Sequence, residues 1–182
     1  MAAMVRVRRM RAEDVETCAR IVAGDPLWRR YGVTLPGARR SFRKALAGAR
    51  WSPSAARATG EIAVAHEGSR VVGFVWFRVE GTFHHSGYVR WIAVAPASRS
   101  HGVGERLMRH AEDRIFRDGP NVFLTVSDFN TKAQAFYHRL GYTRVGTLAD
   151  YVVPGITEYL YRKTQGPIDH TRGTASRRRR LE

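Results

Sequence analysis

The stretch WIAVAPASRSHGVGERLM, residues 91–108, decides the fold prediction. An apolar run stops at Pro96, and a short polar loop containing Gly102 and Gly104 leads at once into a helix-like pattern. A loop that enters a helix presents unpaired backbone N–H groups and the positive end of the helix dipole, and glycines let an anion approach them. The stretch therefore predicts a strand, an anion-binding loop and a helix in succession.

The composition of this loop narrows the kind of anion. The loop lacks the Gly-Lys-Ser/Thr ending of nucleotide triphosphatases, so chemistry on a magnesium nucleotide is not expected. It also lacks the third glycine of the dinucleotide-binding pattern. A pyrophosphate bound without a metal fits this loop best.

Hydrophobic patterning along the rest of the chain predicts an α/β fold with a mixed sheet. The turn EGSR suggests an antiparallel hairpin, and the later strand–helix–strand order requires a crossover and so a parallel pair. Helices are expected on both faces of this mostly antiparallel sheet. Residues 25–37 are turn-rich, and residues 50–60 form a polar loop. The predicted strands are 4–10, 61–66, 71–80, 86–94, 122–126, 142–148 and 157–163, and the predicted helices are 11–24, 38–50, 103–118 and 131–140.

The bulk composition is that of a single globular domain. The chain has 182 residues, of which 43% are hydrophobic. No apolar run approaches the roughly 20 residues that span a bilayer, and the N-terminus lacks a secretory apolar segment. Cys18 is the only cysteine, so an intrachain disulfide is impossible. These features predict a cytoplasmic protein that does not bind a membrane.

The net charge of +15 is carried by 28 Arg and 3 Lys. Such a charge suggests an anionic partner, although a GC-rich genome would also favour arginine codons. Residues 171–182 supply five Arg and one Glu, hence +4, which leaves +11 for the remainder. We expect a domain over residues 1–165 and a flexible basic tail over 166–182, whose final Leu181-Glu182 is typical of a cloning scar.

Two motifs in order resemble the GNAT N-acetyltransferase superfamily. The run Arg99–Gly104 matches the family's (Gln/Arg)-x-x-Gly-x-(Gly/Ala) loop, and the preceding IAVAP is similar to its fourth strand. The segment VFLTVSDFNTKAQAFYHRLGY, residues 122–142, is similar to the second signature, with Asn130, Ala133, the Phe136-Tyr137 pair and a closing Gly-Tyr. The resemblance runs from about residue 4 to 164.

This resemblance implies a GNAT-like fold in which two parallel strands, here 88–94 and 122–126, splay at a bulge and open a V-shaped slot. It implies acetyl-CoA as co-substrate and no metal. The pyrophosphate would bind the N–H groups of the loop, and the pantetheine arm would pair with the edge of the first strand. The implied cofactor-binding residues are Ile92, Ala93, Val94, Arg99, Ser100, His101, Gly102, Val103, Gly104, Glu105, Asn130, Lys132 and Tyr137.

The resemblance also implies two catalytic groups. The Val94 N–H would stabilise the thioester oxyanion, and the Tyr137 hydroxyl would protonate the leaving thiolate. The alternative for Tyr137 is a core tyrosine capped by a backbone carbonyl. Asn130 either contacts the pantetheine or caps a helix, and both roles are compatible. Lys132 either binds the 3′-phosphate or stays solvated.

The general base is not fixed by the motifs. Some relatives that acetylate peptide N-termini carry a Glu five residues before the motif's Asn, where this chain has Thr125. A threonine cannot deprotonate an ammonium. Glu80 and His84 are the candidates put forward, and a water relay is an open alternative. His84 and His85 do not predict a metal site, because adjacent residues on an extended chain face opposite ways. Further candidates are His85, Asp128, Asp150 and Glu158.

The resemblance implies direct acetyl transfer to a primary amine, on a small molecule or at a peptide or protein N-terminus. The acceptor would lie between residues 25–37 and 149–158, where Trp28, Arg29, Arg30, Tyr31, Asp150, Tyr151 and Glu158 occur. A basic nucleic-acid-binding or acyl-CoA-sensing protein without catalysis is the alternative, although no nucleic-acid-reading motif is present. Homodimerisation remains open.

Overall fold

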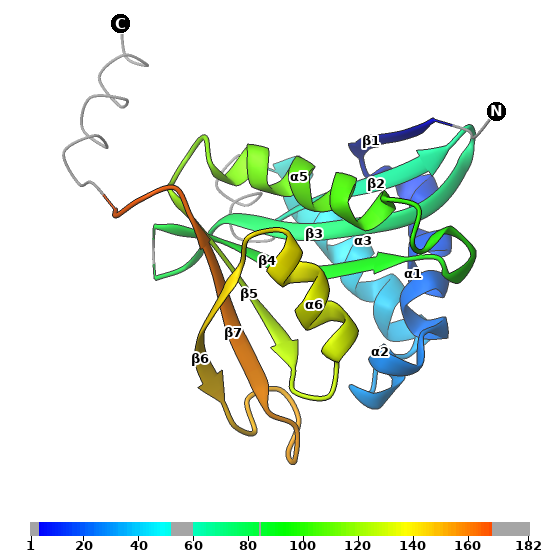
Figure 1. The fold of residues 1–182 in the computed structure, drawn as a ribbon. Coiled ribbons are helices and arrows are strands. Elements are labelled where there is room, and N and C mark those ends of the chain that lie inside the picture. Colours follow the sequence, from blue (N-terminus) through cyan, green and yellow to red (C-terminus); the bar gives the residue numbers. More distant parts are fainter. Residues whose placement is uncertain (1–3, 52–59, 84, 169–182) are drawn as a thin grey trace, which may run out of the picture.

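The fold was analysed in a computed structural model that describes residues 4–51, 60–83 and 85–168. These residues form one seven-stranded sheet in the order β1-β2-β3-β4-β5-β7-β6 (Figure 1). The strands are β1 Val5–Arg9, β2 Glu61–Glu67, β3 Arg70–Thr82, β4 Ser86–Val94, β5 Asn121–Ser127, β6 Thr143–Leu148 and β7 Glu158–Thr164. The α-helices are α1 Val15–Gly24, α2 Pro26–Arg30, α3 Leu35–Trp51, α5 Val103–Ile115 and α6 Thr131–Arg139.

The sheet is mixed, as the sequence predicts. β4 and β5 pair in parallel, whereas the other neighbouring strands pair antiparallel. The β2–β3 hairpin turns at the predicted position, with Glu67 opposite Arg70. α5 supplies the crossover between the parallel strands.

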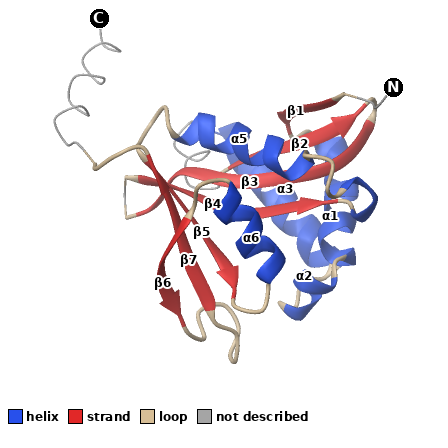
Figure 2. Ribbon diagram, in the orientation of Figure 1, coloured by secondary structure: helices blue, strands red, loops and turns tan. Residues whose placement is uncertain are grey.

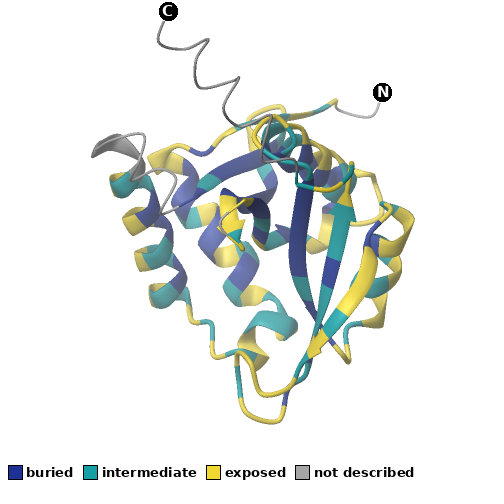
Figure 3. Ribbon diagram, turned by 90° about the vertical axis from the view of Figure 1, so that its left-hand side faces the viewer, coloured by how far each residue is buried: buried dark blue, intermediate teal, exposed yellow. Residues whose placement is uncertain are grey.

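Helices cover both faces of the sheet, and each face has its own apolar core (Figure 2). α5 and α6 pack on one face, with Leu107, Met108 and Tyr137 in the core. α1 and α3 pack on the other, where Phe42 meets Phe74 and Trp76. The buried residues gather on the strands and the inward sides of these helices (Figure 3). The predicted apolar face of α1 is buried as expected and consists of Val15, Cys18, Ala19 and Val22.

The turn-rich segment 25–37 contains more helix than the sequence predicts. α2 begins because the Asp25 side chain accepts a hydrogen bond from the Leu27 N–H and Pro26 occupies the first helical position. α3 begins at Leu35 rather than at residue 38, and the Thr34 hydroxyl accepts from the Gly37 N–H at 3.2 Å. A proline in the first turn needs no N–H partner, so it starts this helix rather than preventing it.

Some expectations lie outside the described residues. These are the polar loop for residues 52–59, His84, and the tail from residue 169 onward. Within the described ranges, none of the helices combines the length and apolar character that crossing a membrane requires.

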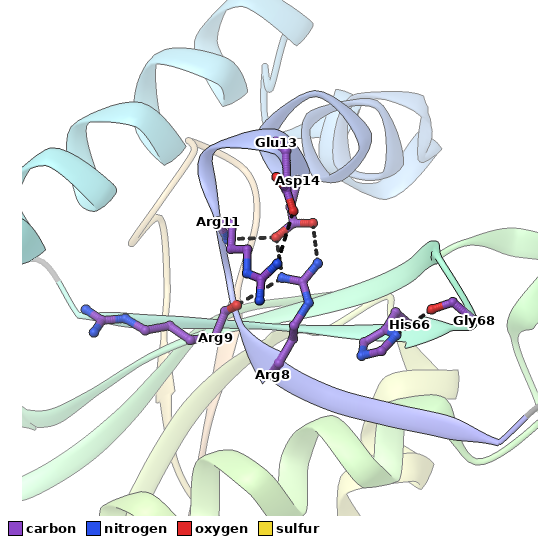
Figure 4. A network of polar contacts seen from close by, with 7 residues as sticks. All are labelled: Arg8, Arg9, Arg11, Glu13, Asp14, His66 and Gly68. Carbon is purple, nitrogen blue, oxygen red and sulfur yellow. Dashed lines mark hydrogen bonds and ion pairs between the residues drawn. The ribbon is translucent and has the colours of Figure 1, made fainter.

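A buried ion pair fastens β1 to the start of α1 (Figure 4). The Arg8 guanidinium donates to both oxygens of Asp14, at 2.7 and 2.8 Å, and the Arg11 N–H donates to Asp14 at 2.7 Å. Burial by itself would raise the pKa of Asp14, but the hydrogen bonds from Arg8 and Arg11 outweigh it and hold that pKa below its usual value. The contribution to stability is therefore present above the unfolded carboxyl's pKa, near 3.9, and is lost as the pH falls through the lower folded value.

We expect Asp14→Ala to lower the free energy of unfolding by about 2 kcal/mol at pH 7, because it leaves a partly buried guanidinium without its counter-ion. Urea titration at pH 7 and pH 3 measures this, and the difference between wild type and variant should shrink at pH 3. Glu13→Ala is the control, since Glu13 is exposed and pairs at 3.4 Å with an exposed Arg11. Equal effects of the two substitutions would contradict the role given to Asp14.

Candidate active site

The parallel strands β4 and β5 separate part-way along their length. Their pairing covers only Gly87–Val122, Tyr88–Phe123 and Val89–Leu124, after which the two strands diverge (Figure 1). The separation begins at a bulge in β4, where Trp91 pairs with Trp76 and Val89 with Phe77, so that Arg90 is an extra residue. A bulge bends a strand and increases its twist, which accounts for the opening.

The backbone of Val94 faces this opening. The Ala95 N–H donates to the Val72 carbonyl on the β3 side, so the alternation of the strand turns the N–H and C=O of Val94 to the opposite edge. The same alternation places Ile92 with Val94 and turns the polar backbone groups of Ala93 toward β3. Of the three residues predicted to pair with a pantetheine arm, Ile92 and Val94 therefore present their backbone polar groups at the open edge, and Ala93 does not.

The loop before α5 forms an anion cradle. Ser100 and Gly102 have φ of 64° and 75°, in the left-handed region, and Gly102 is the N-cap of the 13-residue α5. Within the described part of the chain, the N–H groups of residues 100–105 have no acceptor, whereas the Arg99 N–H donates to the Pro96 carbonyl. Successive free N–H groups at a helix N-terminus suit a phosphate. The cradle thus covers residues 100–105 rather than 99–104.

The two glycines of the loop have different surroundings. A Cβ at Gly102 would have no heavy atom within 4 Å, so a side chain at this position would begin in open space. A Cβ at Gly104 would lie 3.4 Å from Phe136 Cζ and 3.9 Å from Val94 Cγ2. Gly104 therefore lies where the loop, α6 and the end of β4 meet. His101 is exposed, and Glu105 pairs with Arg109 at 2.6 Å.

The Arg99 side chain bridges the cradle to α2. Its Nε donates to the Val94 carbonyl at 3.1 Å, and its Nη2 lies 2.6 Å from Asp25 Oδ2. Asp25 also caps α2 through its other oxygen. A ligand that pairs with the Val94 carbonyl therefore competes with the Arg99 guanidinium for that oxygen.

Tyr137 projects from α6 into the core beneath the cradle. It is 7% exposed and packs against the rings of Phe136 and Tyr142, at centroid distances of 5.2 and 5.7 Å. Its hydroxyl has no hydrogen-bond partner among the described residues, so the alternative of a tyrosine capped by a backbone carbonyl is not found there. Burial raises the pKa of Tyr137 above its ordinary value, and Tyr88 adds to the effect.

The start of α6 is capped by Asn130, whose side chain accepts from the Ala133 N–H at 3.2 Å. Helix capping is thus one role of Asn130. Lys132, in the first turn, is exposed. Asn130 and Lys132 both follow β5 closely in the chain, at the start of α6.

Glu80, the first candidate for a base, is not brought to the Val94 end of this opening. Glu80 lies between Arg78 and Thr82 of β3, which pair with Tyr88 and Ser86, so it neighbours the start of β4. At about 3.3 Å per residue, Val94 is roughly 20 Å further along the strand. Thr125 bonds with the Tyr88 hydroxyl at 3.2 Å.

A polar cluster at the ends of β5 and β7 joins Tyr31 and Glu158, which the sequence predicts on the acceptor side, with Ser127, which the sequence does not single out. The Tyr31 hydroxyl, which follows α2, hydrogen bonds with Ser127 Oγ and donates to Glu158 Oε1. Burial is the main cause that raises the pKa of Tyr31 to about 12 and that raises the pKa of Glu158. The strand register, with Ser127 opposite Glu158, is the signal that could have paired these residues.

A model of the acetyltransferase (GNAT) family matches residues 27–142, more than half of the chain. The chain belongs to this family. The match includes both motifs, the bulged β4 and the cradle before α5.

Individual relatives agree with this GNAT assignment. The N-alpha-acetyltransferase RimI of Mycobacterium tuberculosis is 35% identical over 104 residues, which cover 56% of this chain and 65% of RimI. A GNAT-family protein from Desulfovibrio desulfuricans has a TM-score of 0.71 at 20% identity, covering 88% of this chain and 99% of that one. The yncA protein of Salmonella typhimurium, solved with its cofactor acetyl-CoA, has a TM-score of 0.65 at 13% identity, covering 89% and 94%.

The chain spans less than two thirds of the length of the curated relatives that it matches, namely 65%, 27% and 59%. The structural likenesses at 20% and 13% identity concern the fold. Together these comparisons establish the family and the architecture of this chain.

Proposed function

We propose that this GNAT protein is an acetyl-CoA-dependent N-acetyltransferase that acts by direct transfer to a primary amine. The observation that carries the proposal is the open edge of β4 at Val94, which adjoins a cradle of free N–H groups over residues 100–105. Acetyl-CoA has a thioester at one end and a pyrophosphate further along, and an amide-bearing arm joins the two. This order matches the open edge of β4 and the adjoining cradle. The acetyl-CoA held by yncA supports the choice of co-substrate.

In the proposed reaction, the Val94 N–H donates to the thioester oxygen as negative charge develops on it. The deprotonated amine attacks the carbonyl carbon, a C–N bond forms, and the C–S bond breaks with its electron pair on sulfur. Tyr137 gives its proton to that sulfur. The surplus proton on the new amide nitrogen balances the one that Tyr137 has lost.

Carboxylates on the acceptor side of the slot suit the ammonium group of an amine. Glu158 is buried there; burial is the main cause that raises its pKa, and the charge of Asp128 adds to the shift. The relative RimI is named as an N-alpha-acetyltransferase, which supports a peptide N-terminus as acceptor. Thr125 replaces the glutamate of such relatives, so a small-molecule amine is kept as the second acceptor class.

The proposal is tested by incubating the protein with acetyl-CoA and a panel of primary amines. Release of free thiol, together with a mass increase of one acetyl group on the amine, is the expected result. Neither product forming with any peptide, polyamine or amino sugar, while acetyl-CoA still binds, would favour the acyl-CoA-sensing alternative.

The basic tail is proposed to be an appendage to the catalytic domain, and nucleic-acid binding is the competing use of its charge. We expect deletion of residues 171–182 to leave kcat/KM for acetyl transfer within twofold of wild type. If nucleic-acid binding is the function, the deletion should instead weaken binding to duplex DNA and flatten its salt dependence. Loss of acetyl transfer in the shortened protein would contradict the appendage role.

A further inference from the structure

Glu158, the first residue of β7, is a buried carboxylate without a cationic partner among the described residues. It is 3% exposed. The other two buried carboxylates each have a cation: Arg8 lies 2.7 Å from Asp14, and Lys163 lies 2.6 Å from Glu112. Because burying a charge without a partner is costly, a carboxylate left in this state within a chain of 28 Arg calls for a cation from outside.

The hydrogen bonds of Glu158 leave one oxygen available. Oε1 accepts from the Tyr31 hydroxyl, which also contacts Ser127 Oγ. For Oε2, no partner is found within the ranges that the structure describes. Tyr31 therefore holds one oxygen of Glu158 and is itself held by Ser127 of β5. The second oxygen of Glu158 can accept a hydrogen bond from a ligand.

The position of Glu158 connects it with the reacting end of the slot. Burial is the main cause that raises the pKa of Tyr88 and that of Tyr137; Glu158 adds to the shift of Tyr88, and Tyr88 adds to that of Tyr137. The Tyr88 hydroxyl contacts Thr125, which precedes Ser127 by two residues and shares its face of β5. The ionisable groups that face Glu158 are therefore Tyr31 from beyond α2, Asp128 after β5 and Tyr88 on β4.

We propose that Glu158 is the counter-ion and the proton acceptor for the ammonium group of the acceptor, and that Tyr31 is a positioning residue that holds its carboxylate. This inference rests on the proposed function. In the step, one N–H bond of the ammonium breaks and one O–H bond forms at Oε2, which leaves the lone pair on nitrogen for attack on the thioester. Solvent takes the proton from Glu158 after the product leaves.

The raised pKa of Glu158 suits this role, because a base must hold the proton long enough to pass it on. The charged carboxylate forms as the pH rises through that raised value. Wild-type kcat/KM should therefore reach its plateau above the ordinary glutamate range but well below the pKa of the amine. Without Glu158, only the free amine reacts, and kcat/KM should keep rising until the amine itself loses its proton.

The test compares Glu158→Gln with wild type, since glutamine keeps the shape and can still accept from Tyr31. The probes are alanyl-alanyl-alanine amide, 1,4-diaminobutane and glucosamine, each with its hydroxyl counterpart: lactyl-alanyl-alanine amide, 1,4-butanediol and glucose. Glu67→Gln is the control, because Glu67 lies in the β2–β3 hairpin and pairs with Arg70. Thiol release gives kcat/KM, and calorimetry on the CoA complex gives binding of each probe.

We expect Glu158→Gln to lower kcat/KM for the best amine at least tenfold near pH 6.5, with a loss that shrinks as the pH approaches the amine's pKa. Amine binding should weaken while binding of the hydroxyl counterpart and of acetyl-CoA stays within twofold. The melting temperature should not fall, because the substitution removes a buried charge whose pKa is raised on folding. Glu67→Gln should match wild type.

Tyr31→Phe is the second variant. The Tyr31 hydrogen bond lowers the pKa of Glu158, so its removal should move the start of the kcat/KM plateau to higher pH. Wild-type kcat/KM and pH profile in Glu158→Gln, or equal losses for amine and hydroxyl probes, would overturn this inference alone. A wild-type protein that binds no acetyl-CoA would overturn the proposed function and this inference with it.

Discussion

Replacing Tyr137 by phenylalanine is expected to lower kcat at least tenfold, and up to the 10²- to 10⁴-fold that a general acid contributes. The substitution removes only the hydroxyl that donates a proton to the departing sulfur. Acetyl-CoA affinity should stay within twofold, because the proton is given mainly in the transition state. Stability should change little, since this hydroxyl has no hydrogen-bond partner in the part of the chain that the structure describes.

Tyr142→Phe is the matched control for this experiment. It removes a second buried tyrosine hydroxyl from the same core, 5.7 Å away between ring centroids. We expect its kcat to equal that of wild type. Steady-state rates and calorimetry on both variants separate catalysis from packing. If Tyr137→Phe keeps the wild-type kcat, or fails only in cofactor binding, the proton reaches sulfur by another route.

The pH dependence of the wild-type rate follows from the burial of Tyr137. A tyrosine of ordinary pKa, near 10, would lose its proton and give an alkaline fall in activity at that pH. Burial raises the pKa of Tyr137, so the protonated and active form persists to higher pH. The alkaline fall due to this residue should therefore lie above pH 10.

Substituting Gly102 by aspartate is expected to weaken acetyl-CoA binding by roughly 30- to 100-fold, or about 2–3 kcal/mol. The Cβ would point into open space at the cradle, so the carboxylate reaches the place of the pyrophosphate. Two unit charges about 4 Å apart repel by about 1 kcal/mol in water and about 4 kcal/mol at the effective dielectric constant of a protein surface. The expected loss lies between these limits.

Gly102→Asn is the control that isolates charge from backbone strain. Both side chains have the same shape, and both tolerate the left-handed φ of 75° better than other residues do. Calorimetry should show that the Gly102→Asn variant binds acetyl-CoA at least tenfold more tightly than the Gly102→Asp variant, and this difference should shrink at high salt. Equal affinities of the two variants for acetyl-CoA would show that this loop does not bind the pyrophosphate.

Local patterns were sufficient to predict most of the fold. The apolar run that ends at Pro96 and the glycine loop specify β4, the cradle and α5 within 18 residues. The order strand, helix, strand then requires the parallel pair. The sequence pattern places the start of α3 too late, because Thr34 and the proline in the first turn resemble a helix break but begin the helix in the structure.

The candidate site was only partly predictable, because its acceptor side is built from distant segments. Tyr31 and Glu158 are 127 residues apart in the chain, and no local pattern joins them. The cradle residues and Tyr137 belong to short contiguous motifs and could be proposed from the sequence. The sequence suggests Glu80 as a base, yet the register of β3 and β4 sets it near the start of β4.

The structure of the complex with acetyl-CoA is the most direct test of the central claim, that the opening between β4 and β5 holds the thioester. We expect the pyrophosphate on the N–H groups of residues 100–105 and the thioester oxygen within about 3 Å of the Val94 N–H. We also expect the sulfur beside the Tyr137 hydroxyl and the Arg99 guanidinium displaced from the Val94 carbonyl. Acetyl-CoA bound elsewhere, or with its thioester away from Val94, would contradict the account.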